Sequence, residues 1–492
     1  MIPFGPWEPD KGRFSPDTID TVNNLNPLAN GWGPFADLEE VGSALAGQCL
    51  GLWQARASDG TITIIAGTAS GLYKYNTATL SWDDISGASA PYNVQAGHLW
   101  QAIQFGTKFI VVNLEDPPQV YDVDAGGTFS DLAGTPPQAK FIWIAGDFVV
   151  LGYLKVGSTE YPQRIHWSGI NDATYWTIDR IKGCDRQDLP DGNEITGGFG
   201  FPGAARIFQR DAKRAMIFTG GMFIFEMRVL DATRGCPSPY SIVPISSNDY
   251  VFWRTDGIYR GDDNIPIGAQ RVDGYLFGQP DGDVDVSSLD TVQGVADPFN
   301  KIVLWCYLSA GGVQKIVGWD WELDQFFPLD TAAEYVFSSA APGLSLEAAD
   351  AYADDVDAVG APSLDSRIYR GGAPTLGAIT SSDKLGYFSG GAMAATIETN
   401  TIELNPDNRS FVNGVKLKGD PGSSTTIEVG TAILPDDTVS FGTAYTRSSR
   451  TGLYPARKDG FYHRFRVTTA AGDTSFTHIH GVSPQVQPSG EA

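Results

Sequence analysis

The stretch TITIIAGTASGLYKYNTATLSWDDIS, residues 61–86, decides the fold of this chain. It contains three short runs rich in β-branched and aromatic residues: TITIIAG, GLYKYN and LSWDDIS. The tetrapeptide NTAT at residues 76–79 separates the last two runs and suits a hairpin loop. The stretch therefore predicts three successive antiparallel strands.

This unit recurs along the chain at intervals of about 40–60 residues. Seven apolar-aromatic couplets mark the repeats: Leu72-Tyr73, Val120-Tyr121, Ile165-His166-Trp167, Ile217-Phe218, Ile258-Tyr259, Val317-Gly318-Trp319 and Ile368-Tyr369. Before each couplet stands a strand-like run, in order TIIA, FIVV, FVVL, RIF, YVFW, IVLW and YVF, ending at residues 66, 112, 151, 208, 253, 305 and 337. A repeated unit built of strands predicts an all-β fold, a β-propeller of about seven blades. The count becomes six if the ends of the chain trade a strand.

The first and last repeats of this unit predict the domain boundaries. Residues 1–40 are rich in Pro, Asn and Gly and are expected to form an extended arm, which packs along its own subunit or clasps a neighbour. The propeller is predicted over 41–378, with loop insertions near 179–193, 261–289 and 343–366. Alternating apolar and polar residues over 379–492 predict a C-terminal antiparallel β-sandwich.

Composition narrows the class of protein further. No apolar stretch of 18 residues is present, so a membrane span is not expected. The N-terminus shows no basic region leading into an apolar core, so no secretory signal is expected. Four scattered cysteines fit buried thiols made in a reducing cytoplasm better than disulfides or a zinc site.

Charge is distributed unevenly along the chain. The formal net charge is −24, yet residues 380–492 carry 11 acidic and 10 basic side chains, so the acidity belongs to the repeats. Residues 316–366 hold eleven Asp or Glu and no Lys or Arg. Binding to nucleic acid through phosphate neutralisation needs the opposite sign. The acids form either an ordinary solvated surface or a wall that must not adhere to a polyanion.

Two motifs resemble ligand sites but lack the required context. Gly198, Gly200 and Gly203 stand in G-x-G-x-x-G order, but no helix start follows, so a propeller loop is expected rather than a dinucleotide site. Asp281, Asp283 and Asp285 begin like a calcium loop, but Val286 and Val292 replace the required Gly and Glu. We expect these three acids to be solvated in a loop; the alternative is an irregular cation site.

Four side chains near the C-terminus suggest a subunit contact. His478 and His480 alternate on one predicted strand and share a face. A hairpin centred near Gly472 would place Arg466 opposite His478 and Arg464 opposite His480, a set that suits a carboxylate partner or a neighbouring subunit. No metal is expected here, because zinc needs a third ligand and only His463 is near in sequence.

No signature of catalysis appears in the chain. The G-x-S-x-G, P-loop, H-E-x-x-H and sialidase Asp-box patterns are absent, so neither catalytic residues nor cofactors are expected. Carboxylate pairs for glycoside hydrolysis remain an alternative, because they need proximity in space rather than in sequence.

Several stretches of the sequence, taken together, resemble one protein family. They are RIHWSGINDATYWTID (164–179), IPIGAQRVDGYLF (265–277), VADPFNKIVLWCY (295–307), VGWDWELDQF (317–326), DKLGYFSG (383–390), MAATIETNTIEL (393–404) and GFYHRFRVTTA (460–470). The chain resembles, over residues 40–485, the propeller-containing tail hub or nozzle of short-tailed bacteriophages, also described as packaged-DNA stabilisation proteins.

This resemblance implies a structural virion protein, made in the host cytoplasm and built into the phage tail. It implies a homohexameric ring below the portal and adaptor that encloses a channel, retains packaged double-stranded DNA without specific binding, and lets it pass at ejection. An acidic wall would let the duplex slide. The candidate channel or gate loop contains Glu347, Asp350, Asp354, Asp355 and Asp357, and Asp281, Asp283 and Asp285 form a second candidate loop. The alternative is a propeller that binds or cleaves glycans for host attachment.

Overall fold

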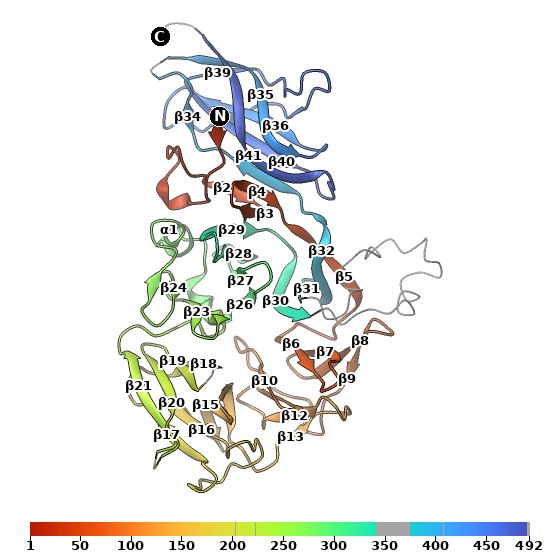
Figure 1. Cartoon of the computed structure of the whole chain (residues 1–492), viewed down its shortest axis with the longest axis vertical. Helices are drawn as coiled ribbons and strands as arrows, with labels where there is room; N and C mark the ends of the chain where they lie inside the picture. Colours follow the sequence, from red (N-terminus) through yellow and green to blue (C-terminus); the bar gives the residue numbers. More distant parts are fainter. Residues whose placement is uncertain (202, 222, 341–373, 407, 490–492) are drawn as a thin grey trace.

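The computed structural model describes residues 1–489 except 202, 222, 341–373 and 407. Its strands form nine antiparallel sheets, and seven of these have four strands each and are arranged as the blades of a ring (Figure 1). The chain is therefore an all-β protein in which a seven-bladed β-propeller is followed by a two-sheet sandwich.

Six blades are built from consecutive strands. Blade one contains β6 (Gly51–Arg56), β7 (Ile62–Gly67), β8 (Leu72–Asn76) and β9 (Ser81–Asp84); blade two contains β10 (Gln101–Phe105), β11 (Lys108–Val112), β12 (Gln119–Asp122) and β13 (Ser130–Asp131); blade three contains β14 (Gln138–Ala145), β15 (Phe148–Val156), β16 (Thr159–Trp167) and β17 (Asp185–Asp188). Blade four contains β18 (Ile195–Phe201), β19 (Ala204–Gln209), β20 (Lys213–Phe218) and β21 (Phe225–Asp231); blade five contains β22 (Val243–Ser246), β23 (Asp249–Trp253), β24 (Ile258–Arg260) and β25 (Ile265–Pro266); blade six contains β26 (Gln293–Asp297), β27 (Ile302–Leu308), β28 (Gln314–Asp320) and β29 (Gln325–Leu329).

The seventh blade joins two distant parts of the chain. Its strands are β30 (Ala333–Ala340), β31 (Pro374–Thr380), β32 (Lys384–Ala392) and β5 (Ala36–Ala44), so an N-terminal strand closes the ring. The predicted boundary at 378 therefore falls inside this blade. The run YVF lies in the first strand, whereas the other six runs lie in second strands, and Ile368-Tyr369 lies outside the described residues.

The six described couplets lie in third strands, and three of them show the same local construction. An aromatic residue of the third strand packs on one in or just before the fourth strand: Tyr75 on Trp82, Tyr121 on Phe129 and Trp319 on Phe326, with ring centroids 5.1, 5.4 and 6.3 Å apart. Between them, the side-chain oxygen of Asn76, Asp122 or Asp320 accepts two backbone N–H groups of the turn. The polar residue fixes the turn and the aromatic pair fixes the hairpin.

Two predicted insertions contain regular structure. The segment near 179–193 includes β17, because the fourth strand of blade three forms after a long turn. The segment 261–289 includes β25, the short helix α1 (Asp273–Phe277) and the start of the 3₁₀ helix η3 (Val286–Thr291). Two further 3₁₀ helices are η1 (Pro9–Lys11) and η2 (Pro239–Ser241). The third insertion, 343–366, lies outside the described residues.

The C-terminal sandwich takes strands from both ends of the chain. One sheet has the order β3 (Leu25–Leu28), β4 (Gly31–Pro34), β41 (Phe476–Pro488), β35 (Ser410–Pro421) and β39 (Lys458–Gly460), with β1 (Ile2–Pro3) on β41. The other has the order β2 (Thr21–Asn23), β33 (Ala395–Glu398), β40 (Tyr462–Thr469), β36 (Thr426–Ala432) and β37 (Ser440–Phe441), with β34 (Ile402–Glu403) on β40 and β38 (Tyr445–Thr446) on β36.

The N-terminal segment therefore packs on its own chain. It supplies strands to both sheets of the sandwich and then closes the propeller through β5. A single hydrophobic core includes Trp32 of this segment, Trp319 of blade six and Phe465 of the sandwich. The sandwich lies at the rim of the ring beside blades six and seven (Figure 1). Shared strands and a shared core join the two domains into one block.

Candidate interaction surfaces

A small cavity lies at the axis of the propeller, among residues that the structure describes. The first strands of blades two, three, four, six and seven line it, and its volume is about 160 Å³. Tyr240 of η2 lies among them; its hydroxyl accepts a hydrogen bond from the Leu99 N–H at 3.0 Å, and its ring centroid is 6.1 Å from that of Phe141. Such a space holds a few water molecules. A DNA duplex cannot pass along this axis.

Two glutamine side chains hold neighbouring first strands together around this axis. Gln104 of β10 accepts from the Arg56 N–H at 2.8 Å and donates to the Arg56 carbonyl at 2.6 Å. Gln293 of β26 makes the same pair of bonds with Val336 of β30, at 3.0 and 2.6 Å. Each amide replaces a backbone partner, so these blades are joined by hydrogen bonds as well as by apolar packing.

The G-x-G-x-x-G segment forms part of the wall of the cavity. Gly198 and Gly200 lie within strand β18, and only Gly203 lies in a hairpin loop, with a φ of 78°. A Cβ at Gly198 would lie 2.6 Å from the Trp143 ring, and one at Gly200 would lie 1.7 Å from the Ile144 carbonyl oxygen. The expected loop is thus mostly strand, and two of its glycines let the first strands of blades three and four approach each other.

The predicted acidic loops have different outcomes. Glu347, Asp350, Asp354, Asp355 and Asp357 lie outside the described residues. Asp283 accepts hydrogen bonds from the Tyr307 hydroxyl at 2.7 Å and from Lys315 Nζ at 2.6 Å. Asp285 caps η3 by accepting the Ser287 N–H at 3.0 Å, and Asp281 is exposed. No group of three potential metal ligands occurs in the described part of the chain. Asp283 and Asp285 have structural partners.

The predicted hairpin between the two arginines and the two histidines is not formed. Arg464 and Arg466 lie on β40, whereas His478 and His480 lie on β41, and these strands belong to different sheets. The connection after Ala470 crosses the sandwich instead of turning back within one sheet. Glu398 accepts from both arginines, at 3.0 and 2.6 Å.

The two groups consequently have separate surroundings. Arg464 also pairs with Asp20 of the N-terminal segment, and Arg466 with Glu428 of β36 at 3.3 Å. The histidine rings share a face, as predicted from their alternation, with centroids 4.6 Å apart. The arginines hold the N-terminal segment and the sheet together, so the four side chains do not form one contact surface.

A polar contact fixes the N-terminal segment to the connection between blades five and six. Asp10 accepts from the backbone N–H groups of Gly274 and Tyr275 at the start of α1, at 2.8 and 2.7 Å. Glu8 pairs with Arg271 at 2.9 Å. Next to them, burial raises the pKa of Asp273 to about 7, and the charge of Asp10 acts in the same direction.

An exposed apolar surface, here named the apolar rim, lies on blades three and four. It comprises Ile178, Ile181, Phe218 and Phe223, with exposed fractions of 50, 92, 43 and 73%. Ile178 and Ile181 come from the β16–β17 loop, and Phe218 and Phe223 from the end of β20 and the β20–β21 loop. Thr219, Phe223, Phe225 and Glu226 surround an adjacent hollow of about 370 Å³.

Packing beneath the apolar rim links its two loops. The Phe148 ring lies 5.8 Å from that of Phe218, and a Cβ placed at Gly183 would lie 3.2 Å from Phe148. The β16–β17 and β20–β21 loops therefore meet over one buried ring. The sequence does not single out this surface, because its residues come from two loops on different blades that only the fold brings together. Exposed apolar clusters of this kind mark interaction sites.

Among the helices that the structure describes, none is long and apolar enough to cross a membrane. No protein-family model matches the chain, and no curated protein matches it. Among solved structures, the chain is similar to the computationally designed Ika8 protein, with a TM-score of 0.40 and 13% identity over 71% of this chain and 99% of that one. It is also similar to a chain of the mitotic checkpoint complex, with a TM-score of 0.37 and 9% identity over 75% of this chain and 93% of that one. Neither TM-score reaches 0.5, so neither similarity indicates a function.

Proposed function

We propose that this chain is a structural subunit of the tail hub, or nozzle, of a short-tailed bacteriophage. Copies of it form a ring, expected to be a hexamer, below the portal and adaptor. The ring encloses a channel, retains the packaged double-stranded DNA, and lets it pass at ejection. The proposal requires no catalytic residue and no cofactor.

Two observations carry the proposal: the propeller axis holds only a 160 Å³ cavity among the described residues, and the propeller and sandwich share one hydrophobic core. The 160 Å³ cavity leaves no passage within one copy, so a channel has to lie between copies. The shared core and the shared N-terminal strands suit a wall element, because they resist relative movement of propeller and sandwich.

The charge of the chain supports the same role. A net charge of −24 repels the phosphate backbone, and such repulsion keeps a sliding duplex from adhering to the channel wall. A protein that held DNA through phosphate contacts would need clustered Lys and Arg. Retention would then come from a physical closure of the channel rather than from contacts to phosphate.

The proposal is tested with phage particles that lack the chain. Mass spectrometry of purified wild-type particles should detect the chain in several copies per particle. Particles assembled without it should package DNA and then lose it, measured as nuclease-sensitive DNA. The proposal fails if the chain is absent from particles or if DNA retention is unchanged without it. Binding of the soluble protein on a glycan array would favour the host-attachment alternative.

A further inference from the structure

We propose that copies of this chain associate head to tail, with the apolar rim of one copy against an aspartate-rich surface on blades one and two of the next. This inference rests on the proposed ring and names the contact that would build it. The occupant of the apolar rim is thus a second copy of the same chain.

The blades that carry the apolar rim differ in charge from the rest of the propeller. Residues 138–231, which form blades three and four, contain 11 acidic and 11 basic side chains and are neutral in a chain of net charge −24. At the most exposed point of the rim, Ile181 stands between Arg180 and Lys182, and both are exposed. The rim therefore presents apolar and cationic groups together, with Asp179 of the same loop close enough to Lys182 to interact with its charge.

Blades one and two show the opposite character. Residues 51–131 contain eight acidic and three basic side chains. Six of the acids are here named the aspartate rim: Asp59, Asp122 and Asp124, at the hairpin end of the two blades, and Asp83, Asp84 and Asp131, in the outer strands β9 and β13. Within the described part of the chain, no ion pair includes any of these six. Lys74 and Lys108 lie opposite Asp83 and Asp122 across their strand pairs, but the acids of this segment outnumber its bases by eight to three.

Hydrogen bonds hold the aspartate rim in place. Asp124 of blade two accepts from the Ser58 N–H and hydroxyl of blade one at 2.8 and 2.7 Å, which connects the two blades at this surface. Backbone N–H groups lower the pKa of Asp59 and Asp122 below the ordinary value. The carboxylates are oriented before any partner arrives, which reduces the entropy lost on association.

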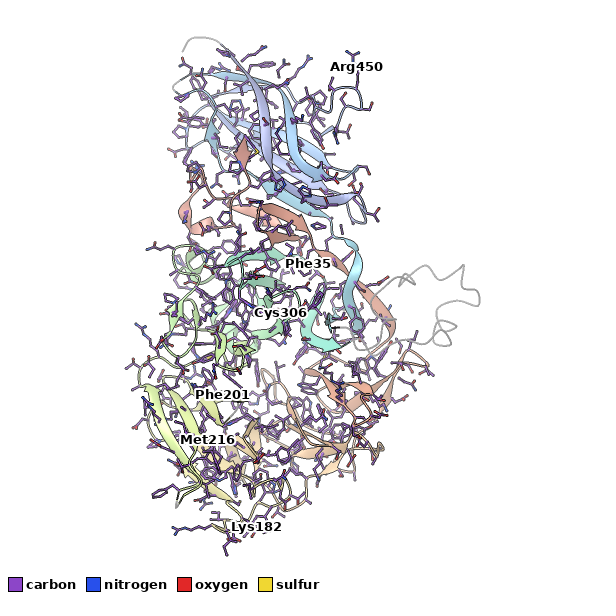
Figure 2. All side chains as sticks on the ribbon, in the orientation of Figure 1. Phe35, Lys182, Phe201, Met216, Cys306 and Arg450 are labelled. Atoms are coloured by element: carbon purple, nitrogen blue, oxygen red, sulfur yellow. The ribbon has the colours of Figure 1, made fainter. Side chains whose placement is uncertain are left out.

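The positions of the two rims suit a head-to-tail arrangement. In Figure 1, β17 and β21 lie at the left edge of the ring and β9 and β13 at the right. Lys182 lies at the end of the molecule remote from Arg450 of the sandwich (Figure 2). Two different surfaces on one subunit make a heterologous contact, which repeats into a ring when the rotation closes. All sandwiches in such a ring would point the same way.

Charge complementarity favours a second copy over an anionic lipid surface. The acids that balance Arg180 and Lys182 are present on the chain itself, whereas a negatively charged membrane would be repelled by a chain of net charge −24. Apolar burial at Ile181 and Phe223 would supply affinity, and the charges would fix the orientation.

A charge exchange tests the contact. The variants are Arg180→Glu with Lys182→Glu, Asp83→Lys with Asp84→Lys, and all four changes together. Sedimentation velocity of the full chain should show at least a ~10-fold rise in the dissociation constant for each double variant, and recovery to within ~3-fold of wild type for the fourfold variant. Arg447→Glu with Arg450→Glu, an exposed basic pair on the sandwich, should leave association unchanged.

Two further variants test the apolar part, and melting temperatures check folding. Ile181→Ser and Phe223→Ser should weaken association without lowering the melting temperature. If the charge-exchange variants assemble as well as wild type does, the proposed contact between the two rims is wrong, whereas the proposed ring is not contradicted. If the variants of the apolar rim lose binding to anionic phospholipid vesicles but assemble like wild type, the apolar rim is a lipid-binding surface instead. A wild-type chain that stays monomeric and is missing from particles overturns both proposals.

Discussion

In three blades, an Asn or Asp at the end of the third strand fixes the turn to the fourth. Asn76, Asp122 and Asp320 each accept two turn N–H groups, and the aromatic residue on either side then meets its partner. The couplets in the sequence reflect this unit, so the propeller could be predicted from residues alone. Tyr240 could not be predicted as a plug, because its partner Leu99 lies 141 residues away.

Gly200 tests the close approach of blades three and four. Its missing side chain accommodates the Ile144 carbonyl, so Gly200→Ala should lower the free energy of unfolding by about 1–3 kcal/mol or more. Gly47→Ala, where nothing lies within 4 Å, should change it by less than about 0.5 kcal/mol. Urea unfolding of both variants makes the comparison. Equal stability of the two variants would contradict the account of the G-x-G-x-x-G segment.

Asp273 predicts a pH dependence of stability. Its folded pKa of about 7 is above the ordinary value of 3.8, so the native state binds this proton more tightly than the unfolded state does. At low pH the carboxyl is neutral and fits its buried site. The free energy of unfolding therefore falls as the pH rises from about 4 to 7, and the contribution of Asp273 is constant above pH 7. Asp273→Asn should remove this decline and gain on the order of 1–2 kcal/mol over wild type at pH 8, after allowance for partial exposure.

The check on Asp273 is a pair of unfolding curves at pH 5 and pH 8. Asp281→Asn, a change at a nearby exposed acid, serves as the control and should follow wild type at both values. An advantage of Asp273→Asn that is the same at pH 5 and pH 8 would contradict the assignment of the titration to this carboxyl.

Strands from distant parts of the chain decide how the elements assemble. Nothing local in residues 36–44 signals that they pair with residues 384–392, so the sequence left the partner of the N-terminal segment open. The predicted hairpin near Gly472 failed for the related reason that β40 and β41 join different sheets. Alternation predicts which residues share a face of one strand, whereas it does not predict which strand comes next to it.

Deletion of residues 1–30 tests the role of the N-terminal segment. The deletion removes β1, β2 and β3 and uncovers the neighbours of buried Trp7, Ile19 and Val22, each worth roughly 1.5–3 kcal/mol. Hydrogen exchange should accelerate in β33 and β41 and stay unchanged in blades two and three. Phe14→Ala, at a half-exposed ring of the same segment, is the control. Unchanged exchange in β33 and β41 would show that the segment is dispensable to the sandwich.

Over the whole molecule, charge and shape point to a role between copies. Blades three and four carry equal numbers of acidic and basic side chains, whereas blades one and two carry a net negative charge. Charge counts in the sequence contain this division, but only the fold assigns the two segments to separate pairs of neighbouring blades. The sequence could not show that the propeller axis is closed, which excludes a channel within one copy.

The central claim is that DNA passes between copies of this chain and not through one. A cryo-electron microscopy reconstruction of the assembled protein tests it most directly. The account predicts a closed ring with an open channel on the symmetry axis, while each propeller axis keeps its small cavity lined by Tyr240. A protein that remains monomeric at every concentration, or an assembly without a through-channel, would contradict it.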